Sequence, residues 1–189
     1  MTPPASAVRR FPPVVVMGVS GCGKSTVGAL LARRLGVPFL DGDDYHPPAN
    51  KEKMAAGVPL TDGDREPWLA RIGQLLAGAG SAATDDGGTA PAPVVACSAL
   101  KRSYRDLLRG TAPGTVFVHL SGGAATIAAR MDARAHEFMP RTLLESQLAT
   151  LEPPAADEDH ILADVRLEPE AIVDAVILEL QSRTAGAAA

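Results

Sequence analysis

Short, unbroken runs of apolar residues recur along the chain and predict buried β-strands. Parallel strands that are covered on both faces are apolar throughout, so they lack the alternating pattern of half-exposed strands. Five segments fit this description, at residues 13–17, 37–41, 93–98, 115–120 and 161–167.

Between these runs, apolar residues recur at the three-to-four-residue spacing of helices. The spacing predicts helices over 24–35, 65–76, 102–109, 124–134, 141–151 and 169–183. Gly36 follows the first of them, where a helix commonly ends. Strands that alternate with helices predict an α/β fold, a three-layer sandwich with a five-stranded parallel sheet between helical layers.

The length of 189 residues predicts a single domain over 1–189. Within it we expect an N-terminal extension at 1–12, a flexible Gly/Pro-rich surface loop at 78–93 and a frayed tail at 185–189. No apolar stretch reaches the ~20 residues of a membrane span, so we expect no membrane partner.

Composition excludes some partners and indicates a compartment. The net charge of −4 argues against nucleic acid, which requires a basic face. The two cysteines are too few for a disulfide framework and predict a reducing, cytoplasmic location.

A glycine-rich segment after the first predicted strand carries the clearest chemistry. The residues GVSGCGKS at 18–25 match G-x-x-x-x-G-K-[ST], a loop whose backbone N–H groups surround the phosphates of a nucleotide. We expect Lys24 to bridge the β- and γ-phosphates of ATP and Ser25 to bind Mg²⁺. The predicted nucleotide-binding residues are Gly18, Ser20, Gly21, Cys22, Gly23, Lys24, Ser25 and Thr26.

Missing motifs narrow the class of nucleotide protein. The chain lacks the Asn-Lys-x-Asp sequence that reads guanine, and the predicted strand at 93–98 ends without the Asp of mechanical ATPases. Carboxylates follow the second predicted strand instead, in the run DGDD at 41–44. With side chains alternating along an extended segment, Asp41 supports Mg²⁺ and Asp43 orients an acceptor hydroxyl. The alternative is a solvated acidic turn.

Four longer stretches resemble the gluconokinases, which are relatives of shikimate and nucleoside-monophosphate kinases. They are MGVSGCGKST (17–26), FLDGDDYHPPANKEKMAAGVPLTDGDREPWL (39–69), CSALKRSYRDLLRG (97–110) and LLESQLATLEP (143–153). The resemblance implies a P-loop kinase fold with a helical lid. It also implies ATP-dependent phosphorylation of D-gluconate at its 6-hydroxyl, giving the 6-phosphogluconate that feeds carbohydrate acid catabolism and the pentose phosphate pathway.

The resemblance also suggests roles for individual residues. His46, Arg65, Lys101 and Arg102 are candidates to bind the hydroxyls and carboxylate of gluconate. Each has a plainer interpretation: His46 caps a turn, Arg65 forms a surface ion pair, and the other two form a solvated turn at a helix start.

Two arginines resemble the lid arginines of that family. Arg130 and Arg134 are four residues apart on one helical face and would neutralise the transferring phosphoryl group, Arg130 as a catalytic residue. A solvated helix face is the alternative. The sequence departs from the family pattern where His136 is displaced by one position, which puts any role for it in doubt.

Other functions remain open at this point. One is another small-molecule kinase of the same fold, for shikimate, adenylylsulfate or a nucleoside monophosphate, and the other is a nucleotide-binding module without turnover. The resemblance suggests a homodimer, although the sequence reveals no exposed apolar stripe for its interface.

Overall fold

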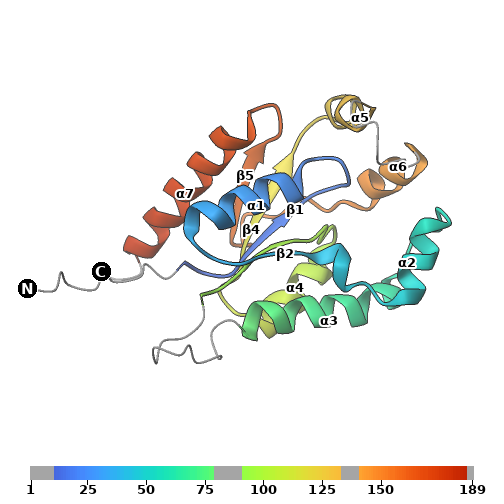
Figure 1. The fold of residues 1–189 in the computed structure, drawn as a ribbon, viewed down its shortest axis with the longest axis horizontal. Helices are drawn as coiled ribbons and strands as arrows, with labels where there is room; N and C mark the ends of the chain where they lie inside the picture. The colour runs from blue at the N-terminus through green and yellow to red at the C-terminus, as the bar shows by residue number, and fades with distance from the viewer. Residues whose placement is uncertain (1–10, 79–90, 133–140, 187–189) are drawn as a thin grey trace, which may run out of the picture.

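The computed structural model describes residues 11–78, 91–132 and 141–186 (Figure 1). Side chains are described for these residues except 130–132, 141–143 and 186. Most of the predicted extension at 1–12 and of the predicted loop at 78–93 therefore lies outside the described residues.

One five-stranded parallel sheet runs through the described part of the chain. Its strands are β1 (Val14–Met17), β2 (Phe39–Asp41), β3 (Val94–Ala96), β4 (Val116–Ser121) and β5 (His160–Asp164), in the spatial order β2-β3-β1-β4-β5. The strand β1 is central, so the loop that leaves it lies in the middle of the carboxyl edge, where open α/β sheets bind ligands. The predicted α/β class with a five-stranded parallel sheet is confirmed.

The fifth strand is shorter than predicted. It ends at Asp164 rather than at 167, because the backbone turns there. The Asp164 carboxylate accepts a hydrogen bond from the Arg166 backbone N–H, and the Asp164 carbonyl accepts one from Leu167. An Asp side chain that bonds its own backbone two residues on is a common way to start a turn.

Helices cover both faces of the sheet, as predicted. They are α1 (Lys24–Leu35), α2 (Pro48–Ala55), α3 (Asp62–Gly78), α4 (Arg102–Thr111), α5 (Ala124–Asp132), α6 (Arg141–Thr150) and α7 (Pro169–Gly186). The helix α7 includes 185 and 186, so the tail predicted at 185–189 was wrong for these two residues. The hydroxyl of Thr184, just before Ala185, donates to the carbonyls of Leu180 and Gln181, and Leu180 is buried in the core.

The start of α3 precedes the predicted helix by three residues. Thr61 and Asp64 form a reciprocal cap, because the Thr61 hydroxyl accepts from the Asp64 N–H while the Asp64 carboxylate accepts from the Thr61 N–H. This Thr-x-x-Asp pattern satisfies N–H groups that a helix start leaves unpaired. This pattern is visible in the sequence and could have predicted where α3 begins.

The segment after β2 corrects the prediction of an extended chain. Residues Gly42–Tyr45 form a short 3₁₀ helix, η1, and α2 follows it, a helix that the apolar pattern did not predict. In α2 the only buried residue is Asn50, so this helix has no apolar face to produce a periodic signal. Polar contacts hold it instead, including a salt bridge of 2.7 Å from Lys53 to Asp64 of α3.

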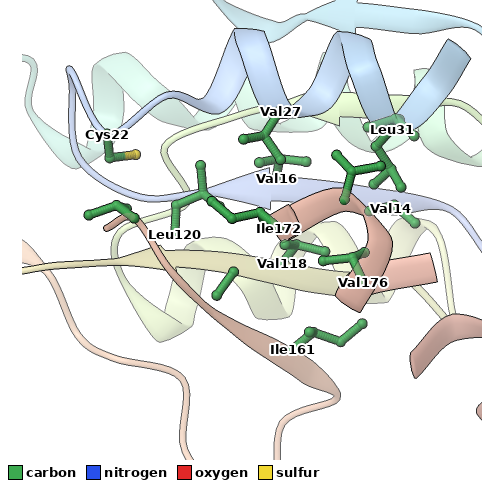
Figure 2. Close-up of a cluster of buried hydrophobic side chains, with 14 of the residues drawn as sticks. Val14, Val16, Cys22, Val27, Leu31, Val118, Leu120, Ile161, Ile172 and Val176 are labelled. Carbon is green, nitrogen blue, oxygen red and sulfur yellow. The ribbon is translucent and has the colours of Figure 1, made fainter. Parts of the chain in front are cut away.

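Two apolar clusters fill the spaces on either side of the sheet. The first lies between the sheet and the helices α1 and α7, and Figure 2 shows Val16, Val27, Val118 and Ile172 meeting there. The second lies between the sheet and the helices α3 and α4, and includes Trp68 and Phe117. None of the described helices has the length and apolar character needed to cross a membrane.

Candidate active site

The glycine-rich loop links β1 to α1 and has the backbone shape of a phosphate cradle. Gly18, Gly21 and Gly23 have φ values of 139°, 79° and 104°, in the left-handed region that favours glycine. A Cβ on Gly18 would approach both the Cys22 sulfur and the Leu120 carbonyl to 2.9 Å. The loop can therefore keep this shape only with glycine at position 18.

The start of α1 is open to an anion. Gly23 caps the helix without a side-chain hydrogen bond, and no acidic residue lies in the first turn. Ser25 and Thr26 are exposed there, whereas the Cys22 side chain is buried in the first apolar cluster. Unpaired N–H groups and the helix dipole attract phosphate at such a terminus. Cys22 can therefore contribute only its backbone to this site.

Lys24 lies folded against its own loop. Its ammonium group donates a hydrogen bond of 3.1 Å to the Val19 carbonyl. The charge therefore stays over the cradle that the glycines form, within reach of phosphate oxygens that the loop would hold.

Ser25 and Asp41 meet at the carboxyl edge of the sheet. The Ser25 hydroxyl donates to the Asp41 carboxylate over 2.7 Å, although β2 and β1 are separated by β3. Within the described residues no group of three His, Cys, Asp or Glu side chains could hold a metal ion. Two neighbouring protein oxygens fit Mg²⁺, which commonly takes one or two protein ligands together with phosphate oxygens and water.

Asp43 lies on η1, with 75% of its side chain exposed. Its backbone N–H donates to the Asp41 carboxylate over 3.1 Å. Burial raises the pKa of the Cys97 thiol at the end of β3 to about 12, and the charges of Asp43, Lys24 and Asp41 all act on that pKa as well. The hydrogen bonds from Ser25 and from the Asp43 N–H to Asp41 therefore place Asp41 and the backbone of Asp43 beside the end of the phosphate loop.

His46 is buried and neutral. Its ring stacks on Trp68 with 4.1 Å between centroids, and burial, followed by the charges of Arg65 and Lys51, lowers its pKa to about 4. The Asn50 amide nitrogen lies 3.3 Å from Nδ1 of His46 and also donates to the Asp64 carbonyl over 2.7 Å, which identifies it as the donor. Nδ1 is then the acceptor, so the proton is on Nε2, 3.8 Å from Asp43.

Arg65 and Lys101 come together around Tyr104. The Arg65 guanidinium carbon and the Lys101 ammonium lie 5.8 and 5.5 Å from the centre of its ring. Asp62 accepts hydrogen bonds from Lys101 and from the Tyr104 hydroxyl, and the Lys101 bond contributes most to lowering the pKa of Asp62. Arg65 donates to the Leu60 carbonyl, and no carboxylate among the described residues forms an ion pair with it.

Arg102 is separate from this pair. Its guanidinium makes two hydrogen bonds, of 3.0 and 2.7 Å, to the Asp157 carboxylate, and its backbone N–H donates to Glu152. Such a bidentate pair occupies the face with which an arginine would bind a substrate carboxylate. The structure thus gives Arg102 a partner within the protein.

The two arginines predicted for the lid are only partly described. Arg130 lies in α5, but its side chain is outside the described residues, and so are Arg134 and His136. Two other residues at the site had no role in the sequence-based prediction. Asn50 holds the His46 ring, and Gln147 of α6 contacts Ser20 of the loop. Both lie in the stretches that resemble the gluconokinases, but no motif with a known mechanism includes them.

Comparisons with known proteins found relatives over most of the chain. A family described as "AAA domain" matches residues 14–154. The chain is 46% identical to a gluconokinase of Gluconobacter oxydans strain 621H, over 89% of this chain and 91% of that protein. It is 43% identical to the thermoresistant gluconokinase of Escherichia coli strain K12, over 86% and 90%. The crystal structure of a gluconokinase from Sinorhizobium meliloti 1021 superimposes with a TM-score of 0.82 and 47% identity, over 94% and 97%.

Proposed function

This chain belongs to the gluconokinase family, and on that premise we propose that it transfers the γ-phosphoryl group of ATP to the 6-hydroxyl of D-gluconate. The products are 6-phosphogluconate and ADP. The observation that carries the proposal is the hydrogen bond of 2.7 Å from Ser25 of the phosphate loop to Asp41, whose carboxylate also accepts a hydrogen bond from the Asp43 backbone N–H. A phosphate cradle and a carboxylate for the acceptor hydroxyl are the two parts that phosphoryl transfer to an alcohol needs.

In the proposed reaction, the 6-hydroxyl oxygen forms a bond to the γ-phosphorus while the bond from that phosphorus to the ADP oxygen breaks. Asp43 accepts the hydroxyl proton as the new bond forms. Lys24, together with Arg130, stabilises the negative charge on the transferring group. Ser25 and Asp41 would hold Mg²⁺, which neutralises phosphate charge when bound, and their hydrogen bond of 2.7 Å supports that assignment.

His46 positions Asp43 rather than binding a sugar hydroxyl. Its Nε2–H lies on the Asp43 side of the ring at 3.8 Å, and the stack on Trp68 fixes the ring plane. A neutral imidazole N–H can orient a carboxylate without placing a positive charge beside it. Contraction of this distance to a hydrogen bond would complete the arrangement when the substrate binds.

Arg65 is the favoured cation for the gluconate carboxylate. Lys101 is already paired with Asp62 over 2.8 Å, and Arg102 with Asp157. Arg65 lies in the same cluster without a carboxylate partner among the described residues, and its planar guanidinium suits bidentate binding of a carboxylate. Lys101 and Tyr104 then contribute hydrogen bonds to substrate hydroxyls.

The proposal extends to cofactor, compartment and assembly. We expect Mg²⁺ dependence, a cytoplasmic location and a homodimer. Both cysteines, Cys22 and Cys97, are buried and form no disulfide with each other, as in proteins of reducing compartments. ATP use follows from the phosphate loop and from the kinase family to which the chain belongs.

Release of ADP across a panel of acceptors tests the proposal. The panel contains D-gluconate, shikimate, adenylylsulfate and nucleoside monophosphates, each with ATP and Mg²⁺. Gluconate should give the highest kcat/KM, and Lys24→Ala should lower its turnover by at least ~10²-fold, as loss of a charge-stabilising donor does. Preference for any other acceptor overturns the substrate, and absence of turnover with all of them favours a binding module.

A further inference from the structure

Gln147 of α6 holds the phosphate loop from a distance of 127 residues in the sequence. Its Oε1 accepts a hydrogen bond of 2.7 Å from the Ser20 backbone N–H, and its Nε2 donates one of 3.1 Å to the Ser20 hydroxyl. A single side-chain amide thus bonds both the backbone and the side chain of one loop residue. The two bonds fix which end of the amide carries the hydrogens.

The helix that carries Gln147 is firmly placed. Leu144, one turn earlier, is 4% exposed, and Leu148 packs against the same apolar cluster. Just beyond the end of α6, the Glu152 N–H donates to the Leu100 carbonyl over 2.8 Å, and the Glu152 carboxylate accepts from the Arg102 N–H. The helix that carries the Gln147 amide is therefore held by contacts both with the core and with the start of α4.

The loop itself needs such a support. Its three glycines give it more conformational freedom than other residues would, and ordering a backbone residue costs about 1–2 kcal/mol. Ser20 lies between Gly18 and Gly21, outside the helix α1 that begins at Lys24. A contact that holds Ser20 before ATP arrives reduces the ordering that nucleotide binding would otherwise require.

We propose that Gln147 is a positioning residue that preorganises the phosphate loop through Ser20, so that its loss weakens nucleotide binding without disturbing the acceptor site. The inference rests on the proposed use of ATP, but not on the identity of the acceptor. An amide nitrogen has two hydrogens, and the bond to Ser20 uses one, so Gln147 can also donate to a phosphate oxygen held by the loop.

The substitution Gln147→Met tests this role, because Met has nearly the same length, favours helix and forms neither hydrogen bond. The dissociation constants of ADP and of a non-hydrolysable ATP analogue, measured by calorimetry without any acceptor, should rise about 5- to 30-fold. This range corresponds to the lower part of the net values that are typical of two hydrogen bonds. The KM of Gln147→Met for gluconate should stay within about twofold of the parent value. The control is Glu145→Gln, which changes an exposed residue of the same helix. Its nucleotide dissociation constants should also stay within about twofold of the parent values.

A second variant changes the loop residue of this contact. Ser20→Ala removes the hydroxyl and leaves the backbone N–H, so Gln147→Met should weaken nucleotide binding by a smaller factor in the Ser20→Ala background than in the parent. Non-additivity of this kind identifies groups that act on each other. Equal factors in both backgrounds, or a lower melting temperature with unchanged nucleotide dissociation constants, would overturn the proposal. Since nucleotide binding is measured alone, failure of gluconate turnover leaves this test intact.

Discussion

At the scale of single residues, Asp43 and Asp44 differ in what surrounds them although they are neighbours with the same charge. The Asp43 carboxylate lies 3.8 Å from Nε2 of His46, and its charge acts on the pKa of the Cys97 thiol. Asp44 contacts Lys51 of α2 through its backbone carbonyl. In the sequence, the alternation of an extended segment favoured Asp43, whereas in the structure both residues lie on η1 and their different contacts distinguish them.

Asp43→Asn should abolish phosphoryl transfer and preserve nucleotide binding. The amide cannot accept the hydroxyl proton, so kcat should fall by about 10²- to 10⁴-fold, the usual contribution of a general base. Steady-state kinetics with gluconate, together with calorimetry of the ATP analogue, measures both effects. Asp44→Asn makes the same change of charge in the same turn and should retain kcat within about twofold. Equal kcat in Asp43→Asn and the parent would exclude the assigned role.

Two buried histidines should make the fold sensitive to mild acid. Burial lowers the pKa of His119, with smaller effects from Arg105 and His160, to about 4 from an ordinary 6.5. His46 is also lowered to about 4. Between these pH values the unfolded chain binds more protons than the folded one, so stability falls as pH decreases from 6.5 to 4 and is unaffected by these groups above 6.5.

His119→Leu should reduce this sensitivity. Neither ring nitrogen of His119 has a hydrogen-bond partner within the described structure, so an apolar replacement leaves no group unsatisfied. Urea unfolding at pH 7.5 and pH 5.5 should show the parent losing more stability than the variant, by on the order of 1 kcal/mol. The same loss in both proteins would show that His119 does not contribute.

At the scale of elements, a buried ion pair joins α4 to the segment before β5. The Arg105 guanidinium makes hydrogen bonds of 2.7 and 2.8 Å to Glu158, and the side chains are 0% and 1% exposed. Arg109 adds a third bond of 3.0 Å to the same carboxylate, and together these hydrogen bonds to Arg105 and Arg109 outweigh burial and lower the pKa of Glu158 to about 2. A charged contact, in addition to apolar packing, thus holds β5 at the edge of the sheet.

Glu158→Gln should destabilise the protein strongly, because it leaves the Arg105 charge buried without a counter-charge. Breaking a buried pair in this way typically costs about 3–5 kcal/mol. Chemical unfolding at neutral pH measures the change. Asp174→Asn, which breaks the exposed pair between Asp174 and Arg34, is the matched control and should cost about 0–1 kcal/mol. A comparable loss in the two variants would contradict the assignment.

The elements also differ in how far the sequence predicted them. The bounds of α1 were predicted correctly at both ends, because the glycine-rich phosphate-loop motif precedes it and Gly36 ends it in the left-handed conformation. The helix α2 was not predicted. Its position depends on the bonds from Asn50 and Lys53 to Asp64, and such contacts between separate helices leave no periodic pattern.

At the scale of the whole molecule, exposed leucines occur on the elements at one end of the sheet. Among the described residues the exposed large apolar side chains are Val58, Leu162, Leu167 and Leu178, and the last three belong to β5, the turn after it and α7. The strand β5 is also an edge strand. An antiparallel pairing of two copies about Leu162 would set His160 opposite Asp164, a complementary arrangement for an isologous dimer.

Leu162→Glu should therefore convert the expected homodimer to a monomer. Light scattering after gel filtration should give about twice the chain mass of 19.5 kDa for the parent and a single chain mass for the variant. Val58→Glu places the same charge on an exposed apolar residue outside this surface and should leave the parent mass unchanged. If the Leu162→Glu protein is a dimer, the interface lies on another surface.

By itself the sequence determined the phosphate loop, the buried strands and the family to which the chain belongs. These features depend on residues that are close together in the chain, since glycine spacing and apolar runs act through local backbone geometry and burial. Only the tertiary structure decided which charged groups meet. Lys101 pairs with Asp62 and its neighbour Arg102 with Asp157, across 39 and 55 residues. These partners follow from the strand order, which brings distant segments together and which no local pattern encodes.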